Sequence, residues 1–189
     1  MNHRRAVFLD RDGTINVEKD YLIDPAEFEF IPGVPQALKR LQEAGFLLVV
    51  VTNQSGVGRG YFSLNQVDRL HRHMSQRLRK YGVRLSGIYV CPHHPTAGTG
   101  QYLTVCNCRK GEPGMLLQAA QELTIDLQQS YMVGDKEADI QAGQAAGCRS
   151  ILVQTGYGCS DTENARRAGA KIVADLAEAA EQILAEQRF

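Results

Sequence analysis

Two aspartates follow the first apolar segment of the chain, at a spacing that could place both carboxylates at one site. Asp10 and Asp12 come directly after Ala6–Leu9, and Gly13 follows them. If the extended backbone continues, residues i and i+2 point the same way, so the two carboxylates face one site. Two negative charges that close repel unless a cation or a shared proton relieves them. A solvated turn is the ordinary alternative for this pattern and stays open here.

Three further polar segments follow apolar runs. Thr52-Asn53-Gln54 ends one run, and the glycine-containing segment 55–60 after it could cradle a phosphate with backbone N–H groups. Arg109 and Lys110 could grip an anion, and Asp135 could bind a hard cation. Taken singly, each segment has an ordinary alternative. Segment 52–60 could be a flexible turn, Arg109-Lys110 a solvated basic pair, and Asp135 a helix N-cap.

Short apolar runs alternate with helical periodicities along the chain. The predicted strands are Ala6–Leu9, Leu47–Val51, Ile88–Val90, Tyr131–Val133, Ser150–Val153 and Ile172–Val173. The predicted helices run from Val34 to a cap at Gly45, from Ser63 to Gly82, from Gly114 to Leu123, from Lys136 to Gly147, and from Leu176 to Leu184. This alternation predicts an α/β fold with a doubly wound parallel sheet, as a single domain over residues 1–189. Ligands of such sheets bind beyond the carboxyl ends of the strands, where the polar segments stand. His71 and His73 are expected on the surface of the long helix.

Composition narrows the class of protein. The chain has 189 residues, and its 21 Lys and Arg balance its 21 Asp and Glu, which argues against nucleic-acid partners and a polybasic membrane anchor. The longest strongly apolar run, Phe46–Val51, is far shorter than the ~20 residues that a membrane span needs. The run Ala6–Leu9 is too short for a signal-peptide core. We therefore expect a cytoplasmic protein without membrane partners, and we expect a monomer.

Three of the five cysteines gather with histidine in one irregular segment. Cys91 and His93 precede Cys106 and Cys108, and three thiols with one imidazole form a natural tetrahedral zinc set. Neither spacing is the commonest zinc-finger pattern, so a reduced, metal-free loop remains an alternative. His94 could also replace His93 as the ligand. Disulfides are rare in the cytoplasm, so we predict a zinc-binding loop over residues 91–108.

Together, the four polar segments resemble the four motifs of the haloacid dehalogenase superfamily of phosphotransferases, in type and in order. The matching motifs are Asp10-x-Asp12-Gly-Thr14, Thr52-Asn53, Lys110 and Gly134-Asp135-x3-Asp139. The resemblance implies the Rossmann-like core of that superfamily. It also implies that Asp10 is the nucleophile, which forms an aspartyl-phosphate, and that Asp12 is the general acid and base. Thr52 and Lys110 would hold the transferring oxygens.

The same resemblance implies a Mg²⁺ site. Its ligands would be the Asp10 carboxylate, the main-chain carbonyl of Asp12 and the Asp135 carboxylate, with Asp139 supporting them through hydrogen bonds. Many superfamily members carry an inserted cap domain. The intervals between Asp10 and Thr52 and between Thr52 and Lys110 leave no room for one. We therefore expect a capless enzyme with an open site.

The cysteine loop narrows the resemblance to a capless branch that includes heptose 1,7-bisphosphate 7-phosphatases and histidinol-phosphate phosphatases. The sequence looks like the heptose family at Val51–Gly56, Tyr89–Pro95, Pro113–Met115 and Val133–Lys136. This likeness favours His93 over His94 as the zinc ligand. A departure is Gly111-Glu112 after Lys110, where the family usually has proline. That difference leaves the substrate contacts of this loop undecided.

By this resemblance the substrate is a sugar bisphosphate, D-glycero-D-manno-heptose 1,7-bisphosphate. Loss of its 7-phosphate would give heptose 1-phosphate for lipopolysaccharide or another surface glycan. Histidinol-phosphate phosphatase is the alternative, with the same chemistry on a cationic substrate. The expected substrate-binding residues are Glu18, Lys19, Asp20, Tyr21, Thr52, Asn53, Gln54, Ser55, Arg109, Lys110 and Lys136.

Overall fold

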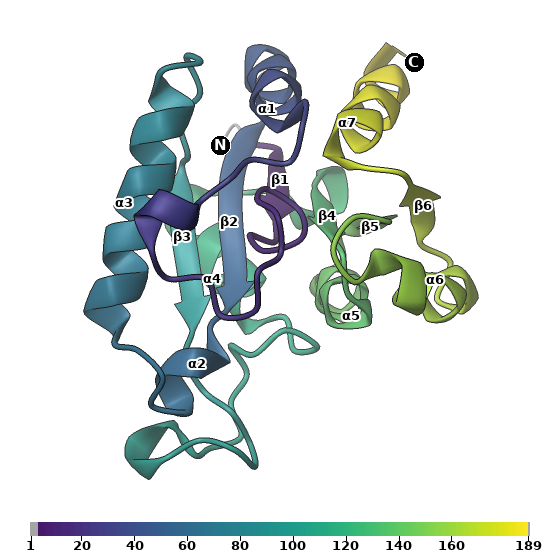
Figure 1. Cartoon of the computed structure of the whole chain (residues 1–189). Coiled ribbons are helices and arrows are strands. Elements are labelled where there is room, and N and C mark those ends of the chain that lie inside the picture. Colours follow the sequence, from purple (N-terminus) through teal and green to yellow (C-terminus); the bar gives the residue numbers. More distant parts are fainter. Residues whose placement is uncertain (1–3, 189) are drawn as a thin grey trace.

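Six short strands form one parallel sheet at the centre of the protein, in a computed structural model that describes residues 4–188 (Figure 1). The strands are β1 (Ala6–Leu9), β2 (Leu47–Asn53), β3 (Gly87–Cys91), β4 (Tyr131–Gly134), β5 (Arg149–Val153) and β6 (Lys171–Val173). Their order is β3-β2-β1-β4-β5-β6, and every neighbouring pair is parallel. The chain therefore winds outward from β1 in both directions, which confirms the predicted doubly wound sheet. Residues 1–3 and 189 of the predicted domain lie outside the described residues.

The described part of the chain also contains seven α-helices and four short 3-10 helices, of which α7 and η4 follow the last strand. The α-helices are α1 (Val34–Glu43), α2 (Ser55–Gly58), α3 (Leu64–Arg79), α4 (Gly114–Leu123), α5 (Glu137–Ala146), α6 (Gly158–Arg167) and α7 (Leu176–Ala185). The 3-10 helices are η1 (Pro25–Glu27), η2 (Gly100–Tyr102), η3 (Leu127–Gln129) and η4 (Glu186–Arg188). Among the described residues, no helix is both long enough and apolar enough to cross a membrane.

Two helices were not predicted from the sequence. The helix α6 buries only Gly158 and Ala165, so its sequence lacks the apolar stripe that reveals a helix. The single turn α2 lies where the sequence suggested a flexible turn. The start of α3 is as predicted, because the Ser63 side chain accepts a hydrogen bond from the Gln66 backbone N–H in a capping box.

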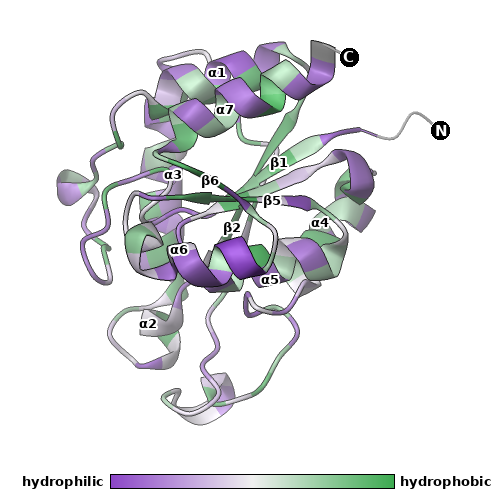
Figure 2. Cartoon of the chain, turned by 90° about the vertical axis from the view of Figure 1, so that its right-hand side faces the viewer, coloured by the Kyte–Doolittle hydropathy of each residue, from purple (hydrophilic) through white to green (hydrophobic). Residues whose placement is uncertain are grey.

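The central strands of the sheet are buried on both faces. Val7 and Leu9 pack with α1, α3 and α7, whereas Ala6 and Phe8 pack with α4 and α5. All four side chains have no exposed surface. Figure 2 shows the result: green, hydrophobic strands lie in the middle, and green and purple alternate along the helices that cover them. Burial on both faces explains why these strands read as continuous apolar runs.

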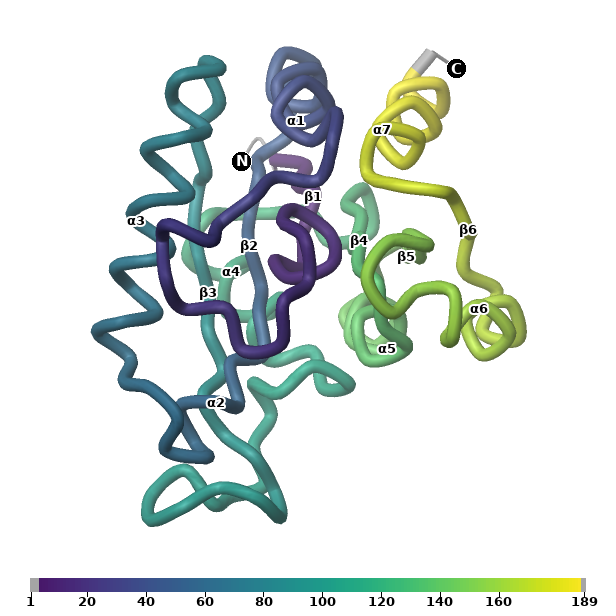
Figure 3. Tube along the Cα trace, in the orientation of Figure 1, coloured from purple at the N-terminus to yellow at the C-terminus, as the bar shows by residue number. Residues whose placement is uncertain are grey.

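The two intervals in which a cap domain could be inserted are fully described by the structure. Between Asp10 and Thr52 the chain forms η1, α1 and most of β2. Between Thr52 and Lys110 it forms α2, α3, β3 and the loop that contains η2 (Figure 3). Neither interval contains a separate domain, so the carboxyl end of the sheet is capless, as predicted.

Candidate active site

The predicted site residues converge at the carboxyl ends of β1, β2 and β4, which are neighbours in the sheet. A cleft with a volume of about 450 Å³ opens there. The predicted residues that line it are Asp10, Asp12, Glu18, Asp20, Tyr21, Thr52, Asn53, Gln54, Ser55, Lys110 and Lys136. The order in which successive strands are added to the sheet reverses between β1 and β4, and ligands of doubly wound sheets bind at such a switch point.

Three carboxylates form a cluster at the floor of this cleft: Asp10 and Asp139 line the cleft, and Asp135 is fully buried beside them. Asp10, Asp135 and Asp139 each place an oxygen within 4.8 Å of the others, and all three are buried. One oxygen of Asp135, Oδ2, accepts the backbone N–H of Tyr157 at 2.9 Å. The other, Oδ1, is buried without a hydrogen-bond partner among the described residues. Burial, together with the charges of Asp10 and Asp139, raises the pKa of Asp135 to about 8. An unpartnered oxygen among repelling carboxylates fits a hard divalent cation such as Mg²⁺.

Lys110 is fixed beside the same cluster. Its Nζ lies 2.7 Å from an Asp10 oxygen, 2.7 Å from an Asp139 oxygen and 2.8 Å from the carbonyl of Val51. Burial alone would lower the pKa of Lys110, but the two carboxylates outweigh it and raise the pKa. Asn53 holds the backbone of this lysine on both sides, since its Oδ1 accepts the Lys110 N–H at 3.0 Å and its Nδ2 donates to the Lys110 carbonyl at 3.2 Å. Asn53, in the Thr52-Asn53 motif, therefore positions Lys110, which is the next motif along the chain.

Asp12 lines the same cleft but has a different cationic partner. The Arg11 guanidinium donates to both oxygens of the Asp12 carboxylate, and Asn16 and Gln54 donate one further hydrogen bond each. Burial disfavours the charged form of Asp12, but the charge and hydrogen bonds of Arg11 outweigh it and lower the pKa. Two separate cations, Lys110 for Asp10 and Arg11 for Asp12, thus relieve the repulsion that the sequence predicted.

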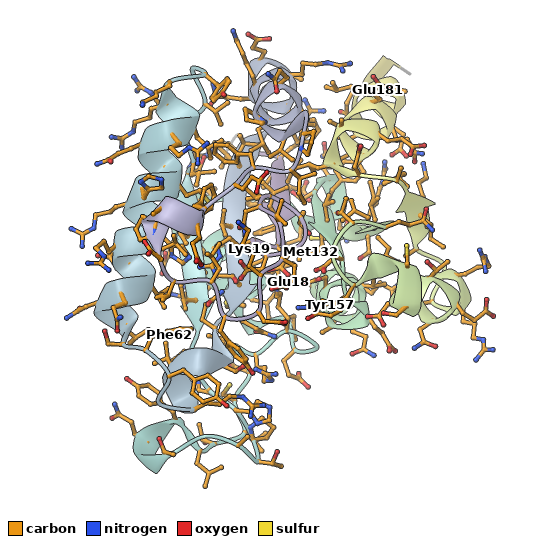
Figure 4. All side chains as sticks on the ribbon, in the orientation of Figure 1. Glu18, Lys19, Phe62, Met132, Tyr157 and Glu181 are labelled. Carbon is orange, nitrogen blue, oxygen red and sulfur yellow. The ribbon has the colours of Figure 1, made fainter. Side chains whose placement is uncertain are left out.

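The rim of the cleft combines the loop after β1 with the start of α6. The Lys136 Nζ lies 3.5 Å from Glu18 and 4.7 Å from the centre of the Tyr157 ring. The Tyr157 hydroxyl donates to Asp20 at 2.7 Å. Figure 4 shows Glu18 and Tyr157 close to each other from these two parts of the chain. Asp20 and Tyr21 both adopt positive φ, so this loop has an uncommon conformation. The rim can thus contact a substrate from two directions.

Two predicted substrate-binding residues lie outside the cleft lining. The Lys19 Nζ donates to the carbonyl of Glu27 at 2.8 Å. The Arg109 guanidinium donates to the carbonyl of His93 at 3.1 Å, in the cysteine loop. Neither side chain is among the residues that line the cleft.

The cysteine loop brings its predicted ligand atoms together. The sulfur atoms of Cys91, Cys106 and Cys108 lie 3.2 to 3.7 Å apart, and His93 Nδ1 lies 3.3 Å from the Cys108 sulfur. With zinc–sulfur bonds of ~2.3 Å, the sulfur atoms of a tetrahedral site are about 3.8 Å apart. The donor set therefore fits a tetrahedral metal ion. His94 is not part of it, because its Nδ1 accepts the backbone N–H of Ala97.

This loop packs against the turn that carries Ser55. The backbone N–H and the hydroxyl of Thr99 both donate to the carbonyl of Gly58, at 2.8 and 3.1 Å. Figure 3 shows the teal loop beside α2, at the carboxyl end of the sheet. The cluster of Cys91, His93, Cys106 and Cys108 is thus connected to both sides of the cleft, through α2 and through the adjacent Lys110.

Several residues in or near the cleft were not predicted from the sequence. Tyr157, Ser160 and Asp161 line the cleft from the start of α6, the helix that the periodicity does not reveal. The surface prediction for His71 was wrong, because this side chain is 4% exposed. His71 lies one turn after Val67 on the buried stripe of α3, and that spacing could have revealed its burial.

The chain is similar to several known phosphatases. The family model described as HAD-hydrolase-like matches residues 107–179. The D-glycero-beta-D-manno-heptose-1,7-bisphosphate 7-phosphatase of Haemophilus ducreyi is 52% identical over 81% of this chain and 85% of its own length. The enzyme of the same name from Escherichia coli is 48% identical over 92% of this chain and 92% of its own length. The crystal structure of the D,D-heptose 1,7-bisphosphate phosphatase of B. bronchiseptica, complexed with magnesium and phosphate, is 38% identical with a TM-score of 0.85. That likeness covers 96% of this chain and 99% of the other.

Proposed function

The chain belongs to the heptose-1,7-bisphosphate 7-phosphatase family of haloacid dehalogenase-like hydrolases, and we propose that it removes the 7-phosphate of D-glycero-D-manno-heptose 1,7-bisphosphate. The product would be heptose 1-phosphate, a precursor of lipopolysaccharide or another surface glycan. The observation that carries this proposal is the Asp10 carboxylate, held at the cleft floor between Lys110 and the Asp135–Asp139 pair. That arrangement suits a nucleophile which must meet a phosphate dianion.

The orientation of Asp10 supports its role as nucleophile. Its Oδ1 accepts the Arg11 backbone N–H at 2.7 Å and lies 2.7 Å from the Lys110 ammonium. With Oδ1 held in this way, Oδ2 would attack phosphorus, forming the aspartyl-phosphate as the phosphorus–oxygen bond to the sugar breaks. Asp12 would give a proton to the leaving sugar oxygen and later take one from the attacking water.

The cation and the surrounding donors would stabilise the transferring group. Asp10, Asp135 and the main-chain carbonyl of Asp12 would hold Mg²⁺, which offsets the repulsion between phosphate and carboxylate. Thr52 and Lys110 would hold the phosphate oxygens. Lys110 meets this need because Asn53 and two carboxylates fix its position before substrate arrives.

The rest of the substrate would lie along the rim. Glu18, Asp20, Tyr21 and Lys136 would contact the sugar, while segment 53–55 would complete the phosphate site. Lys19 and Arg109 belong to the same proposal, although their contacts lie outside the cleft lining. Arg109 would reach the second phosphate only after it leaves the His93 carbonyl.

We also propose that Cys91, His93, Cys106 and Cys108 hold a structural Zn²⁺ ion. The spacing of their donor atoms supports this assignment, and four protein ligands leave no open position for a reacting water. Because Cys108 directly precedes Arg109 and Lys110, the metal would restrain the segment that carries the phosphate-binding lysine. We further propose that the chain acts as a single-domain monomer in the cytoplasm, where its thiols stay reduced. Light scattering after size-exclusion chromatography tests the monomer.

Steady-state kinetics with three substrates tests the proposed function. The α and β anomers of heptose bisphosphate are compared with histidinol phosphate in the presence of Mg²⁺, and released phosphate is measured. We expect a higher kcat/KM for at least one heptose anomer, with the 1-phosphate retained in the ³¹P spectrum of the product. Asp10→Asn protein, purified in the same way, measures any contaminating phosphatase. A higher kcat/KM for histidinol phosphate would overturn the substrate assignment.

A further inference from the structure

A charged side chain is fully buried directly beside the proposed general acid and base. Arg11 has no exposed surface, and it is the residue between Asp10 and Asp12. Buried guanidinium groups are rare unless they are paired. The Arg11 Nε donates to one Asp12 oxygen at 3.1 Å, and one terminal nitrogen donates to the other at 2.7 Å. This two-point contact fixes the plane of the carboxylate, which a single contact cannot do.

The guanidinium is itself held by a histidine from a distant part of the chain. The other terminal nitrogen of Arg11 lies 3.0 Å from His71 Nε2. Arginine only donates hydrogen bonds, so His71 Nε2 must be the acceptor, and the ring is neutral with its proton on Nδ1. Burial and the charge of Arg11 lower the pKa of His71 to about 3, which is consistent with a neutral ring.

His71 and Asp12 lie in different kinds of element. It lies on α3, which begins with a capping box and buries Val67, Leu70, Met74 and Leu78 in the same stripe. Asp12, in contrast, lies in the turn after β1. The contacts therefore run from a packed helix through His71 and Arg11 to the carboxylate. Without the His71 acceptor, one buried N–H group of Arg11 would lack its partner, and only Asp12 and the carbonyl of Leu22 would hold the guanidinium.

We propose that Arg11 and His71 are positioning residues that hold the Asp12 carboxylate in the orientation needed for proton exchange with the leaving oxygen. The inference rests on the proposed phosphatase function and deepens it. It assigns a role to the residue inside the Asp-x-Asp motif and to a histidine whose place in the sequence gives no sign of the active site.

Two substitutions at one position test this chain of contacts. His71→Gln can place a carbonyl oxygen where Nε2 accepts the hydrogen bond, whereas His71→Leu fills the space but cannot accept. Misplacement of a reacting group by about 1 Å costs on the order of 100-fold in rate. For heptose bisphosphate we expect His71→Leu to lower kcat/KM by about 30-fold, and His71→Gln to stay within about threefold of the wild type.

The leaving group separates a positioning role from a purely structural one. The leaving oxygen of 4-nitrophenyl phosphate needs little protonation, while a sugar or glycerol leaving group needs the proton from Asp12. Because kcat/KM reports the steps up to aspartyl-phosphate formation, His71→Leu should lose less than about threefold with the aryl phosphate. Inhibition by inorganic phosphate should be unchanged, which shows that the phosphate site is still folded.

Each outcome decides the proposal. Selective loss on alkyl phosphates, rescued by His71→Gln, supports it. Equal losses on the aryl and alkyl phosphates would overturn it in favour of a structural role, and so would full activity of His71→Leu. A wild type that hydrolyses aryl and glycerol phosphates but not heptose bisphosphate would refute the proposed substrate alone. The comparison between those two remaining substrates would still test Arg11 and His71.

Discussion

Replacing Asp135 by Asn tests whether the carboxylate cluster is stable only with a cation. In the metal-free chain the pKa of Asp135 rises from 3.8 to about 8, because the group is buried and lies beside Asp10 and Asp139. The folded chain then binds this proton more tightly than the unfolded chain does. The free energy of unfolding therefore falls as the pH rises from about 4 to about 8.

The asparagine side chain removes this repulsion. Its Oδ1 can accept the Tyr157 N–H as Asp135 does, and its Nδ2 can donate to a neighbouring carboxylate in place of the unpartnered oxygen. One pKa unit corresponds to ~1.4 kcal/mol, and the cluster shares the shift among its members, so we expect a gain of about 2 kcal/mol at pH 8. For a chain of this length that is an increase of about 4–8 °C in Tm.

Scanning calorimetry in EDTA at pH 5 and pH 8 measures the effect. Asp135→Asn should exceed the wild type in Tm at pH 8, and the difference should shrink at pH 5. Asp161→Asn is the matched control, because Asp161 lines the same cleft but lies outside the cluster and caps the Glu137 N–H. Its Tm should follow the wild type at both pH values. Added Mg²⁺ should raise the Tm of the wild type but not that of Asp135→Asn, which should have lost turnover.

Two results would refute this reasoning. The first is an Asp135→Asn protein in EDTA at pH 8 that is no more stable than the wild type. The second is a stability difference that does not change between pH 5 and pH 8. Either one would mean that the three carboxylates do not repel one another as their separation and burial require.

Four further predictions concern the nucleophile, both metals and the rim. Asp10→Asn should stay folded but lose more than about 1,000-fold in kcat and form no acid-stable phosphoprotein. Near-normal turnover would rule out covalent catalysis. Ca²⁺ should compete with Mg²⁺ in binding assays yet support little turnover, because its looser coordination misplaces the nucleophile; full activity with Ca²⁺ would contradict this site. Cys108→Ser should contain no zinc in elemental analysis, and its Tm should be lower than that of the wild type. Its kcat should fall by about 100-fold while its Mg²⁺ affinity is unchanged. A zinc-free variant with full activity would disprove the structural role of zinc. Tyr157→Phe removes the hydrogen bond to Asp20, so KM for the sugar substrate should rise about three- to tenfold while aryl phosphate kinetics stay constant. An unchanged KM for the sugar substrate would mean that Tyr157 has no part in substrate binding at the rim.

The doubly wound sheet, and the order of the chemical groups along it, could be predicted from the amino-acid pattern alone. Strands that are buried on both faces must be apolar throughout, so β2 was visible as Leu47–Val51 without any structure. The parallel topology then places every strand end at one edge, which is why Asp10, Thr52 and Asp135 could be assigned to one site. The metal loop was suggested by its donor types, three thiols and one imidazole, because donor type limits which ions such a loop can bind.

The pairing of the groups within that site depends on the folded chain. Asp10 pairs with Lys110 and Asp12 with Arg11, within the one cleft that both carboxylates line. The fold also directs Arg109 to the His93 carbonyl. The direction of a side chain depends on contacts between residues far apart in the chain, and no local pattern contains those contacts.

The same reason explains why two residues of the site, Tyr157 and His71, were not predicted from the sequence. Tyr157 reaches the cleft from the start of α6, whose few buried residues leave no periodic signal. His71 shares the buried stripe of α3 with apolar residues, and its own polarity suggested the surface. Its burial is tolerated because Arg11, which follows β1, donates the hydrogen bond that the ring nitrogen of His71 needs. That partner is set by the packing of α3 against the sheet, which only the folded chain determines.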